Sequence, residues 1–552
     1  MKRIILAITI CSLCLSLCAC GITPNADVAA TPATTATPAP METVPVETDA
    51  PARYPLVSEP TYFSLWGTLG ASIAMFMDTR TNNPVIQKAG EITGVYLDCA
   101  EVPSTMGAEQ FGVLLASDEL PDFVFGFQAY YPAGYEAAVN DGFLVDLMPY
   151  LDEYAPEYKY ALESHDLLRD VTTDSGYLSY FCIVSENTIQ DRGIGLRKDW
   201  LDKVGLDIPE TYDELEAVLT AFKTELDKPG SFFLSSLGAS GGQSIAGGFG
   251  VADCYKPGFK DFPYTVQDGE VIFGWTQEEY KQVLKLYNKW YEEDLLWKDF
   301  FSSGASHIVG MNTTGRAEFS SGKLGCGYME VANIDDLPLT SGDAEMEVIG
   351  IVSPTLTKGE INHGTQPPAK YGYGFSLSTS CEDIETAIKY MNFYYTQEGI
   401  DLANYGIVGQ ACEIVDGKRQ FTDLILNNEE GMSMRVAINV YCLDGWGTVS
   451  DKSRENAGFS DVALEAAAIW LSNSDSAWYY PISCSMTAEE AETWSTLFAT
   501  IDTYHNETVL QFITGELDID AGWEDYLAQM EELGASEATM CRQAAYNRYI
   551  ER

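Results

Sequence analysis

Two patterns of apolar and polar positions alternate along most of this chain. Short apolar runs typical of buried strands occupy residues 62–69, 120–127 and 193–196, and stretches with helical spacing of apolar residues occupy 83–93 and 197–204. Strands that alternate with helices predict α/β lobes with mainly parallel sheets. No repeat of solenoid length is visible in the sequence.

Helix starts with the S/T-x-x-E pattern of a capping box support this assignment. Such pairs occur three times: Thr211 with Glu214, Thr276 with Glu279, and Thr487 with Glu490. Apolar residues follow the first two at helical spacing: Leu215, Val218, Leu219, Phe222, Tyr280, Val283, Leu284 and Tyr287. We therefore expect helices to begin directly after these three threonines.

The length of the chain favours more than one lobe. Its 552 residues exceed what one hydrophobic core usually serves. Hydrophobic residues make up 46% and aromatic residues 12%, which supplies enough apolar material for packed cores.

The N-terminus has the pattern of an export signal. Lys2 and Arg3 precede an uncharged apolar run that ends at residue 20, which is too short for a comfortable membrane span. Its last residues, LCACG at 17–21, resemble the lipobox of bacterial lipoproteins, in which Cys20 would carry a diacylglycerol group. The alternative is an ordinary cleaved signal without lipid. We predict a lipoprotein signal segment over residues 1–20.

Residues 21–55 are rich in Ala, Thr and Pro, with little that could pack in a core. This composition predicts a disordered tether between the lipid and the folded body. About 33 residues span roughly 30 Å as a coil and at most about 100 Å as polyproline II.

The charge balance narrows the set of partners. With 32 basic and 82 acidic residues, the formal net charge is −50. Such a chain repels nucleic acid and anionic membrane surfaces. We therefore expect no nucleic-acid partner, and membrane association through the lipid on Cys20 only.

The thirteen cysteines do not form an evident disulfide framework. Four lie in the first 20 residues, and the other nine are scattered without a C-x-x-C motif. Many free thiols in an exported protein indicate a reducing habitat. One or two bridges with the remaining cysteines buried are equally compatible with the sequence.

Motifs for catalysis, metal binding and cofactor binding are missing from the sequence. The four histidines are isolated, and the G-x-G at 193–195 lacks the third glycine of a dinucleotide site. Residues 242–246 (GQSIA) narrowly miss the nucleophile elbow and are better explained as a surface loop. We predict no catalytic residues, no metal and no cofactor, although 82 carboxylates leave a glycoside hydrolase possible by motif.

Aromatic residues beside glycines are the most informative chemical feature. Sugar rings stack their C–H faces on flat aromatic rings, while polar groups bond the hydroxyls. The chain has 10 Trp, 32 Tyr and 24 Phe, and some of them stand in polar, glycine-containing stretches: Trp66, Tyr130, Tyr131, Tyr373 and Trp446. Each could instead be a half-buried core aromatic. As a set they predict a sugar-binding cleft.

Four stretches, in order, resemble the family 1 extracellular solute-binding proteins of bacterial carbohydrate ABC transporters, particularly the long Gram-positive lipoproteins. They are LPDFVFG at 120–126, IGLRKDWL at 194–201 with the helix start at 209–215, GKLGCGYM at 322–329, and YGFSL at 373–377 with 387–399. The tail at 512–515 and 523–527 also fits. The resemblance covers most of the chain from about residue 56 onward.

The resemblance implies an α/β, two-lobed periplasmic-binding-protein-like fold of type II, whose lobes are joined by hinge strands with multiple crossovers. We expect the first lobe at 56–190 and 368–425, and the second at 191–367 and 426–552. It implies a monomeric extracellular lipoprotein on the cell membrane that captures a mono- or oligosaccharide in the interlobe cleft. Delivery to the permease subunits of an ABC importer would follow.

In relatives, the loop after the third of these stretches lines the cleft, as do the loops after the first strand and after LPDFVFG. Together with the glycine-flanked aromatics, this predicts eight ligand-binding residues: Trp66, Gln128, Tyr130, Tyr131, Tyr328, Glu330, Tyr373 and Trp446. Two other functions stay open: an exported hydrolase acting on a polysaccharide, and a surface adhesin or sensory partner without a role in transport.

Overall fold

The structure is a computed structural model that describes residues 53–117, 120–131, 134–234, 246–251, 263–300, 309, 313–363 and 368–552. Its contacts separate residues 1–52 from a compact unit at 53–552, and everything below concerns the latter. The predicted signal segment, Cys20 and nearly all of the predicted tether lie outside the described residues, as do residues 242–245 of the near-miss motif.

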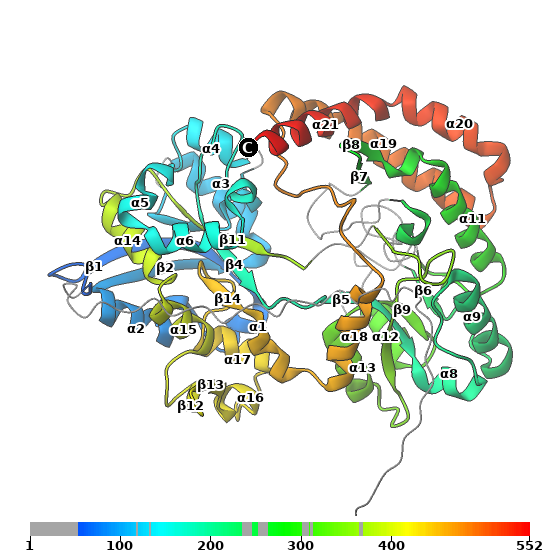
Figure 1. Cartoon of the computed structure of the whole chain (residues 1–552), viewed down its shortest axis with the longest axis horizontal. Coiled ribbons are helices and arrows are strands. Elements are labelled where there is room, and N and C mark those ends of the chain that lie inside the picture. The colour runs from blue at the N-terminus through cyan, green and yellow to red at the C-terminus, as the bar shows by residue number, and fades with distance from the viewer. Residues whose placement is uncertain are drawn as a thin grey trace, which may run out of the picture. The chain divides into compact units, whose positions relative to one another are not determined.

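Two main sheets organise this unit (Figure 1). The strand order of the first is β14-β4-β11-β3-β1-β2, with these bounds: β1 Thr61–Leu69, β2 Val95–Pro103, β3 Phe123–Phe125, β4 Phe181–Glu186, β11 Tyr371–Leu377 and β14 Val449–Asp451. The order of the second is β10-β5-β9-β6: β5 Arg192–Arg197, β6 Phe232–Phe233, β9 Cys326–Glu330 and β10 Val348–Ile351. Two hairpins are separate: β7 Tyr264–Gln267 with β8 Glu270–Phe273, and β12 Cys412–Val415 with β13 Lys418–Phe421.

We call the six-stranded sheet with its helices the first lobe. Its helices are α1 Ala71–Ala74, α2 Pro84–Thr93, α3 Gly107–Ser117, α4 Gly134–Asn140, α5 Leu151–Tyr154, α6 Pro156–Ser164, α7 Leu168–Val171, α14 Ile384–Phe393, α15 Gln397–Tyr405, α16 Asp423–Leu426 and α17 Met434–Tyr441. In this sheet β1 runs parallel to β2 and β3, and β11 lies antiparallel between β3 and β4. Buried aliphatic and aromatic residues of β1, β2, α2, α6 and α14 form its core.

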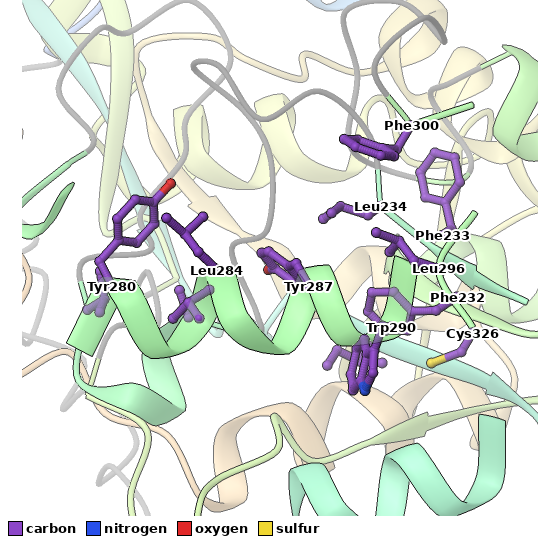
Figure 2. Close-up of a cluster of buried hydrophobic side chains, with 14 of the residues drawn as sticks. Phe232, Phe233, Leu234, Tyr280, Leu284, Tyr287, Trp290, Leu296, Phe300 and Cys326 are labelled. Carbon is purple, nitrogen blue, oxygen red and sulfur yellow. The ribbon is translucent and has the colours of Figure 1, made fainter. Parts of the chain in front are cut away.

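The four-stranded sheet belongs to the second lobe. The helices of this lobe are α8 Lys198–Val204, α9 Tyr212–Leu226, α11 Glu278–Glu292, α12 Thr313–Ser320, α13 Val331–Ser341, α18 Asp461–Ser472, α19 Ala488–Thr514, α20 Ile519–Glu532 and α21 Ala535–Glu551. Figure 2 shows one part of its core, where Tyr287 and Trp290 of α11 point toward Phe232 and Leu296. The 3.6-residue period in the sequence therefore marks the buried face of α11.

Glycines let α18 pack closely on the second sheet. A Cβ atom on Gly193 would lie 2.2 Å from Cγ of Trp470. The Trp470 indole N–H also donates a hydrogen bond to the Ile194 carbonyl over 2.9 Å. A side chain at position 193 would therefore displace the indole.

The chain passes between the two sheets three times, which confirms the predicted lobes with multiple crossovers. The first crossing joins β4 to β5, the second joins β10 to β11, and the third runs from β14 through the 3-10 helix Lys452–Gly458 to α18. The crossings are bonded to one another: the Ser185 amide donates to the Lys370 carbonyl over 2.8 Å, and the Asn187 amide side chain donates to Asp451 over 2.8 Å.

The last passage differs in position from the predicted boundary. The sequence places residues from 426 onward in the second lobe, whereas β14 pairs in parallel with β4 of the first sheet. Buried residues of α17 also share a core with Met77 of the first lobe. By pairing and packing, the first lobe extends to Asp451, and the third crossing follows it.

Two of the three predicted capping boxes are present. Thr211 caps α9 with Glu214, and Thr487 caps α19 with Glu490. The prediction at Thr276 is wrong. A 3-10 turn covers Gly274–Thr276, the Thr276 hydroxyl donates to the Phe273 carbonyl over 2.9 Å, and α11 begins after Gln277.

The eight cysteines in the described ranges are buried thiols, and no disulfide joins any two of them. Burial raises the pKa of the Cys99 and Cys182 thiols to about 12. In the same ranges, no helix has the length and apolar character needed to span a membrane. No cluster of metal-ligating side chains occurs there either.

Candidate functional site

A cavity of about 300 Å³ lies among the three crossings and is lined by both lobes. Its walls come from residues 185–192 of the first crossing, Pro368 and Ala369 of the second, and Lys452 to Phe459 of the third. The end of β9 supplies Tyr328 and Glu330. A change in the angle between the lobes would therefore change the shape of this cavity.

Ion pairs fix the polar groups of this cavity. The Arg192 guanidinium donates to Glu330 over 3.1 Å, directly opposite it on β5 and β9, and lies 3.6 Å from Asp191. Burial would lower the pKa of Arg192, but the charges of Asp191 and Glu330 outweigh burial and raise it. The pair stays charged, and its oxygen and nitrogen atoms keep fixed positions on the cavity wall.

Further polar and aromatic groups face the same space. Gln190 is only 4% exposed; its amide N–H donates to the Arg192 carbonyl over 3.1 Å, and its Oε1 accepts no hydrogen bond. Arg435 of α17 also lines the cavity and forms no ion pair within the described part of the chain. Tyr328 and Phe459 add ring surface.

A second cavity, of about 220 Å³, adjoins the first on the side of the first lobe. Trp446 and Phe375 line it, together with a buried ion pair between Arg80 and Glu101. The two cavities are joined by an ion pair, because Asp444 lines the second and accepts from Lys452 of the first over 3.2 Å.

The charges around Asp444 explain why it remains ionised. Burial would raise the pKa of Asp444, but Lys452 and Arg454 lie close enough to lower it. Arg454 donates to Asp444 over 3.1 Å and to the Asn404 carbonyl over 2.8 Å. Lys452 also pairs with Glu455 over 2.8 Å, so the third crossing is held by charges on both sides.

Comparison with known protein families identifies the chain. A family model described as bacterial extracellular solute-binding protein matches residues 88–400, which is more than half of the sequence. The chain belongs to this family. The match spans both sheets and the first two crossings, so the cavity between the lobes lies in the part of the fold that defines the family.

Individual relatives agree with this assignment. The solute-binding protein is 24% identical over 472 residues to the lipoprotein LipO of Bacillus subtilis, covering 82% of this chain and 87% of LipO. It is 22% identical over 496 residues to the fructooligosaccharide ABC transporter substrate-binding protein FusA of Streptococcus pneumoniae, covering 84% and 87%.

A solved structure supports the fold. An HMO-binding, ABC-transporter-associated solute-binding protein from Bifidobacterium longum infantis matches with a TM-score of 0.72 and 21% identity. The match covers 89% of this chain and 99% of that one. The two-lobed periplasmic-binding-protein-like fold predicted for this solute-binding protein is therefore confirmed.

The structure distributes the eight predicted ligand residues over three places. Tyr328 and Glu330 line the cavity between the lobes, and Trp446 lines the adjoining one. Trp66 is buried against Phe111, with its ring 5.4 Å away.

The other predicted residues lie near Trp66 or on β11. Tyr130 packs edge-on to Trp66 at 5.3 Å, Tyr131 donates to Asp141 over 2.5 Å, and Gln128 accepts from the Tyr135 hydroxyl. Tyr373 is partly exposed, and its pKa is raised to about 12 by burial and by the neighbouring Tyr130. These five do not line either cavity, and their contact with a ligand remains a prediction.

Sequence reasoning missed the charged residues of the crossings. Arg192, Lys452 and Arg435 come from segments far apart in the chain, and none stands in an aromatic or glycine-rich context. The available signal is weak: Asp191-Arg192 directly precedes the strand that resembles the family, and Lys452 follows a short polar strand.

Proposed function

We propose that this solute-binding protein captures an oligosaccharide between its two lobes and delivers it, unaltered, to the permease subunits of an ABC importer. One observation carries the proposal: a cavity formed by three adjacent crossings and lined by both lobes, in a chain of the solute-binding family. Binding there would favour one angle between the lobes, which a permease could recognise.

The chemistry of the cavity suits a sugar. Carboxylates and guanidinium groups held in ion pairs present fixed acceptors and donors to hydroxyl groups, and ring surfaces suit the C–H faces of a pyranose or furanose. Glu330, Arg192 and Tyr328 offer these features together. We assign Tyr328 and Glu330 to direct ligand contact, and Trp446 to the end of the ligand that reaches the adjoining cavity.

The sugar class is supported by relatives. FusA is named for fructooligosaccharide and the Bifidobacterium protein is named as HMO-binding. We infer an oligosaccharide rather than a monosaccharide, because the two cavities lie side by side across the Asp444–Lys452 pair. Trp66, Gln128, Tyr130, Tyr131 and Tyr373 are proposed to contact the ligand at the edge of the first lobe.

We propose that the mature protein is a monomer held on the outer face of the cell membrane by lipid on Cys20. The support is the lipobox-like LCACG sequence and the similarity to a relative named as a lipoprotein. Changing Cys20→Ser should move the protein from the membrane fraction to the culture medium. Retention of the variant in the membrane fraction would contradict lipid anchoring.

Titration calorimetry with a panel of oligosaccharides tests the proposed function. The panel should include fructooligosaccharides, milk-type oligosaccharides and uronate-containing oligosaccharides, with free amino acids and short peptides as the contrast. One sugar class is expected to bind at one site per chain. Binding of peptides, with no heat from any sugar, would remove the sugar assignment.

The same samples separate capture from hydrolysis. We infer that the protein performs no catalysis, in line with relatives that are named as binding proteins. Chromatography of each sugar after incubation should return it intact. Accumulation of shorter products would favour the exported hydrolase instead.

A further inference from the structure

The end of α21 makes a noncovalent connection between the lobes that is separate from the three crossings. We call it the latch, and define it by these residues: Asp170 and Asp174 of the first lobe, and Ser483, Ser485, Arg548, Tyr549 and Arg552 of the second. Asp170 and Asp174 lie in and just after α7. α21, the red helix of Figure 1, packs on α19 and β8 of the second lobe.

Asp174 is the centre of the latch. Its Oδ2 accepts from Arg548 Nε over 2.6 Å, and its Oδ1 accepts from Arg552 Nε over 2.8 Å and from the Ser485 hydroxyl over 3.3 Å. Arg552 also donates to the Thr172 carbonyl over 2.6 Å. One carboxylate of the first lobe therefore binds two guanidinium groups of the second.

Asp170 extends the same contact. Its Oδ1 accepts from the Tyr549 hydroxyl over 2.7 Å and from the Ser483 hydroxyl over 2.9 Å. The Arg169 guanidinium lies over the Tyr549 ring, 4.8 Å from its centre. The latch thus combines ion pairs, hydroxyl donors and a cation–π contact on one stretch of the first lobe.

Burial separates these contacts from ordinary surface ion pairs. The Arg552 side chain is 5% exposed and that of Asp174 is 20% exposed. Partly buried charges that share one partner are screened less by water, and each depends on the others for compensation. A rotation of the lobes that parted them would expose two arginines that have lost their shared carboxylate.

We propose that the latch restrains the relative rotation of the two lobes and holds the arrangement in which Asp174 meets Arg548 and Arg552. The three crossings alone permit hinge bending, and the latch limits its range. The proposal extends the proposed capture of a solute between the lobes, but its test requires no ligand. A failure to find a sugar would leave that test unaffected.

The test measures the distance between the lobes in the full chain without ligand. Spin labels attached through noncanonical amino acids at Tyr160 of α6 and Leu339 of α13, which are 61% and 83% exposed, report on the two lobes. Asp174→Arg places a third guanidinium against Arg548 and Arg552. The distribution of distances between the labels is expected to become broader, with a new population absent from the native protein.

Glu490→Gln is the matched control. Glu490 pairs with Arg548 over 2.5 Å, but both residues belong to the second lobe, and Gln still serves at the third position of the α19 capping box. Its distance distribution should match that of the native protein. An unchanged distribution in Asp174→Arg, with native circular dichroism, would overturn the proposal, as would equal broadening in both variants.

A milder variant covers the case in which Asp174→Arg does not fold. Asp174→Asn keeps the shape and removes the charge, so a smaller broadening is expected. The same distribution for native and Asp174→Asn protein at low and high salt would then overturn the proposal. Broadening by salt in the native protein alone would support it, because salt weakens the ion pairs that the variant lacks.

Discussion

At the scale of single residues, the molecule places charged and aromatic groups where neither alone would be stable. Arg192 and Glu330 form one of the ion pairs of the cavity, and they meet because β5 and β9 are antiparallel in one register. Tyr328 lies two residues before Glu330 on the same face of β9. A shift of one residue in that register would remove both from the cavity.

Tyr328→Ala should weaken oligosaccharide binding by about tenfold, or about 1.4 kcal/mol, because the ring surface for stacking is lost. The dissociation constant from calorimetry gives the measurement. Tyr160→Ala is the control, because Tyr160 is exposed on α6 and lies outside both cavities. Equal affinity of the Tyr328 variant and the native protein would exclude Tyr328 from the site.

His505 gives the second lobe a dependence on pH. It is fully buried, stacked on Trp275 with 3.6 Å between ring centres, and hydrogen-bonded to the Tyr526 hydroxyl over 2.9 Å. Burial lowers its pKa from 6.5 to about 3. The unfolded chain therefore binds a proton between pH 6.5 and 3 that the folded chain does not, and stability falls as the pH falls through this range.

His505→Gln, which does not titrate, should lose this part of the pH dependence. The full effect corresponds to roughly 5 kcal/mol for a shift of about 3.5 pH units. Urea unfolding at pH 7, 5 and 4 gives the free energies of unfolding, and the native protein should lose more stability than the variant. Parallel losses in both proteins would assign the acid sensitivity to other groups.

At the scale of elements, helix starts could be predicted where the local sequence decides them. Thr211 and Thr487 cap their helices because each side chain bonds only to its own first turn. Thr276 has the same pattern, but Phe273 before it offers a carbonyl that the hydroxyl prefers, and a 3-10 turn delays the helix. The three-residue strand β14 carries too short a pattern to be found from sequence.

Gly193→Ala should destabilise the second lobe by about 1–3 kcal/mol, because the added methyl overlaps the Trp470 ring and forces α18 away from the sheet. Thermal unfolding gives the measurement. Gly112→Ala is the matched control: it lies inside α3 with nothing within 4 Å of the new Cβ atom, and Ala favours helix by up to about 1 kcal/mol. Equal melting temperatures for Gly193→Ala and native protein would contradict the packing of Trp470 described above.

At the scale of the whole molecule, family resemblance predicted the lobes better than it predicted the site. The ordered motifs gave the two-lobed fold, because each motif belongs to a strand of one of the sheets. Tyr328 and Glu330 line the cavity because they follow such a motif. Lys452 and Arg435 could not be placed, since they reach the cavity only through the late return of β14 to the first sheet.

The most direct test of solute capture is a crystal structure with the tightest-binding sugar of the panel. An intact oligosaccharide is expected between the lobes, with a ring against Tyr328, a hydroxyl bonded to Glu330, and one end in the cavity beside Trp446. A sugar bound outside both cavities, or only its cleaved fragments between the lobes, would contradict the account.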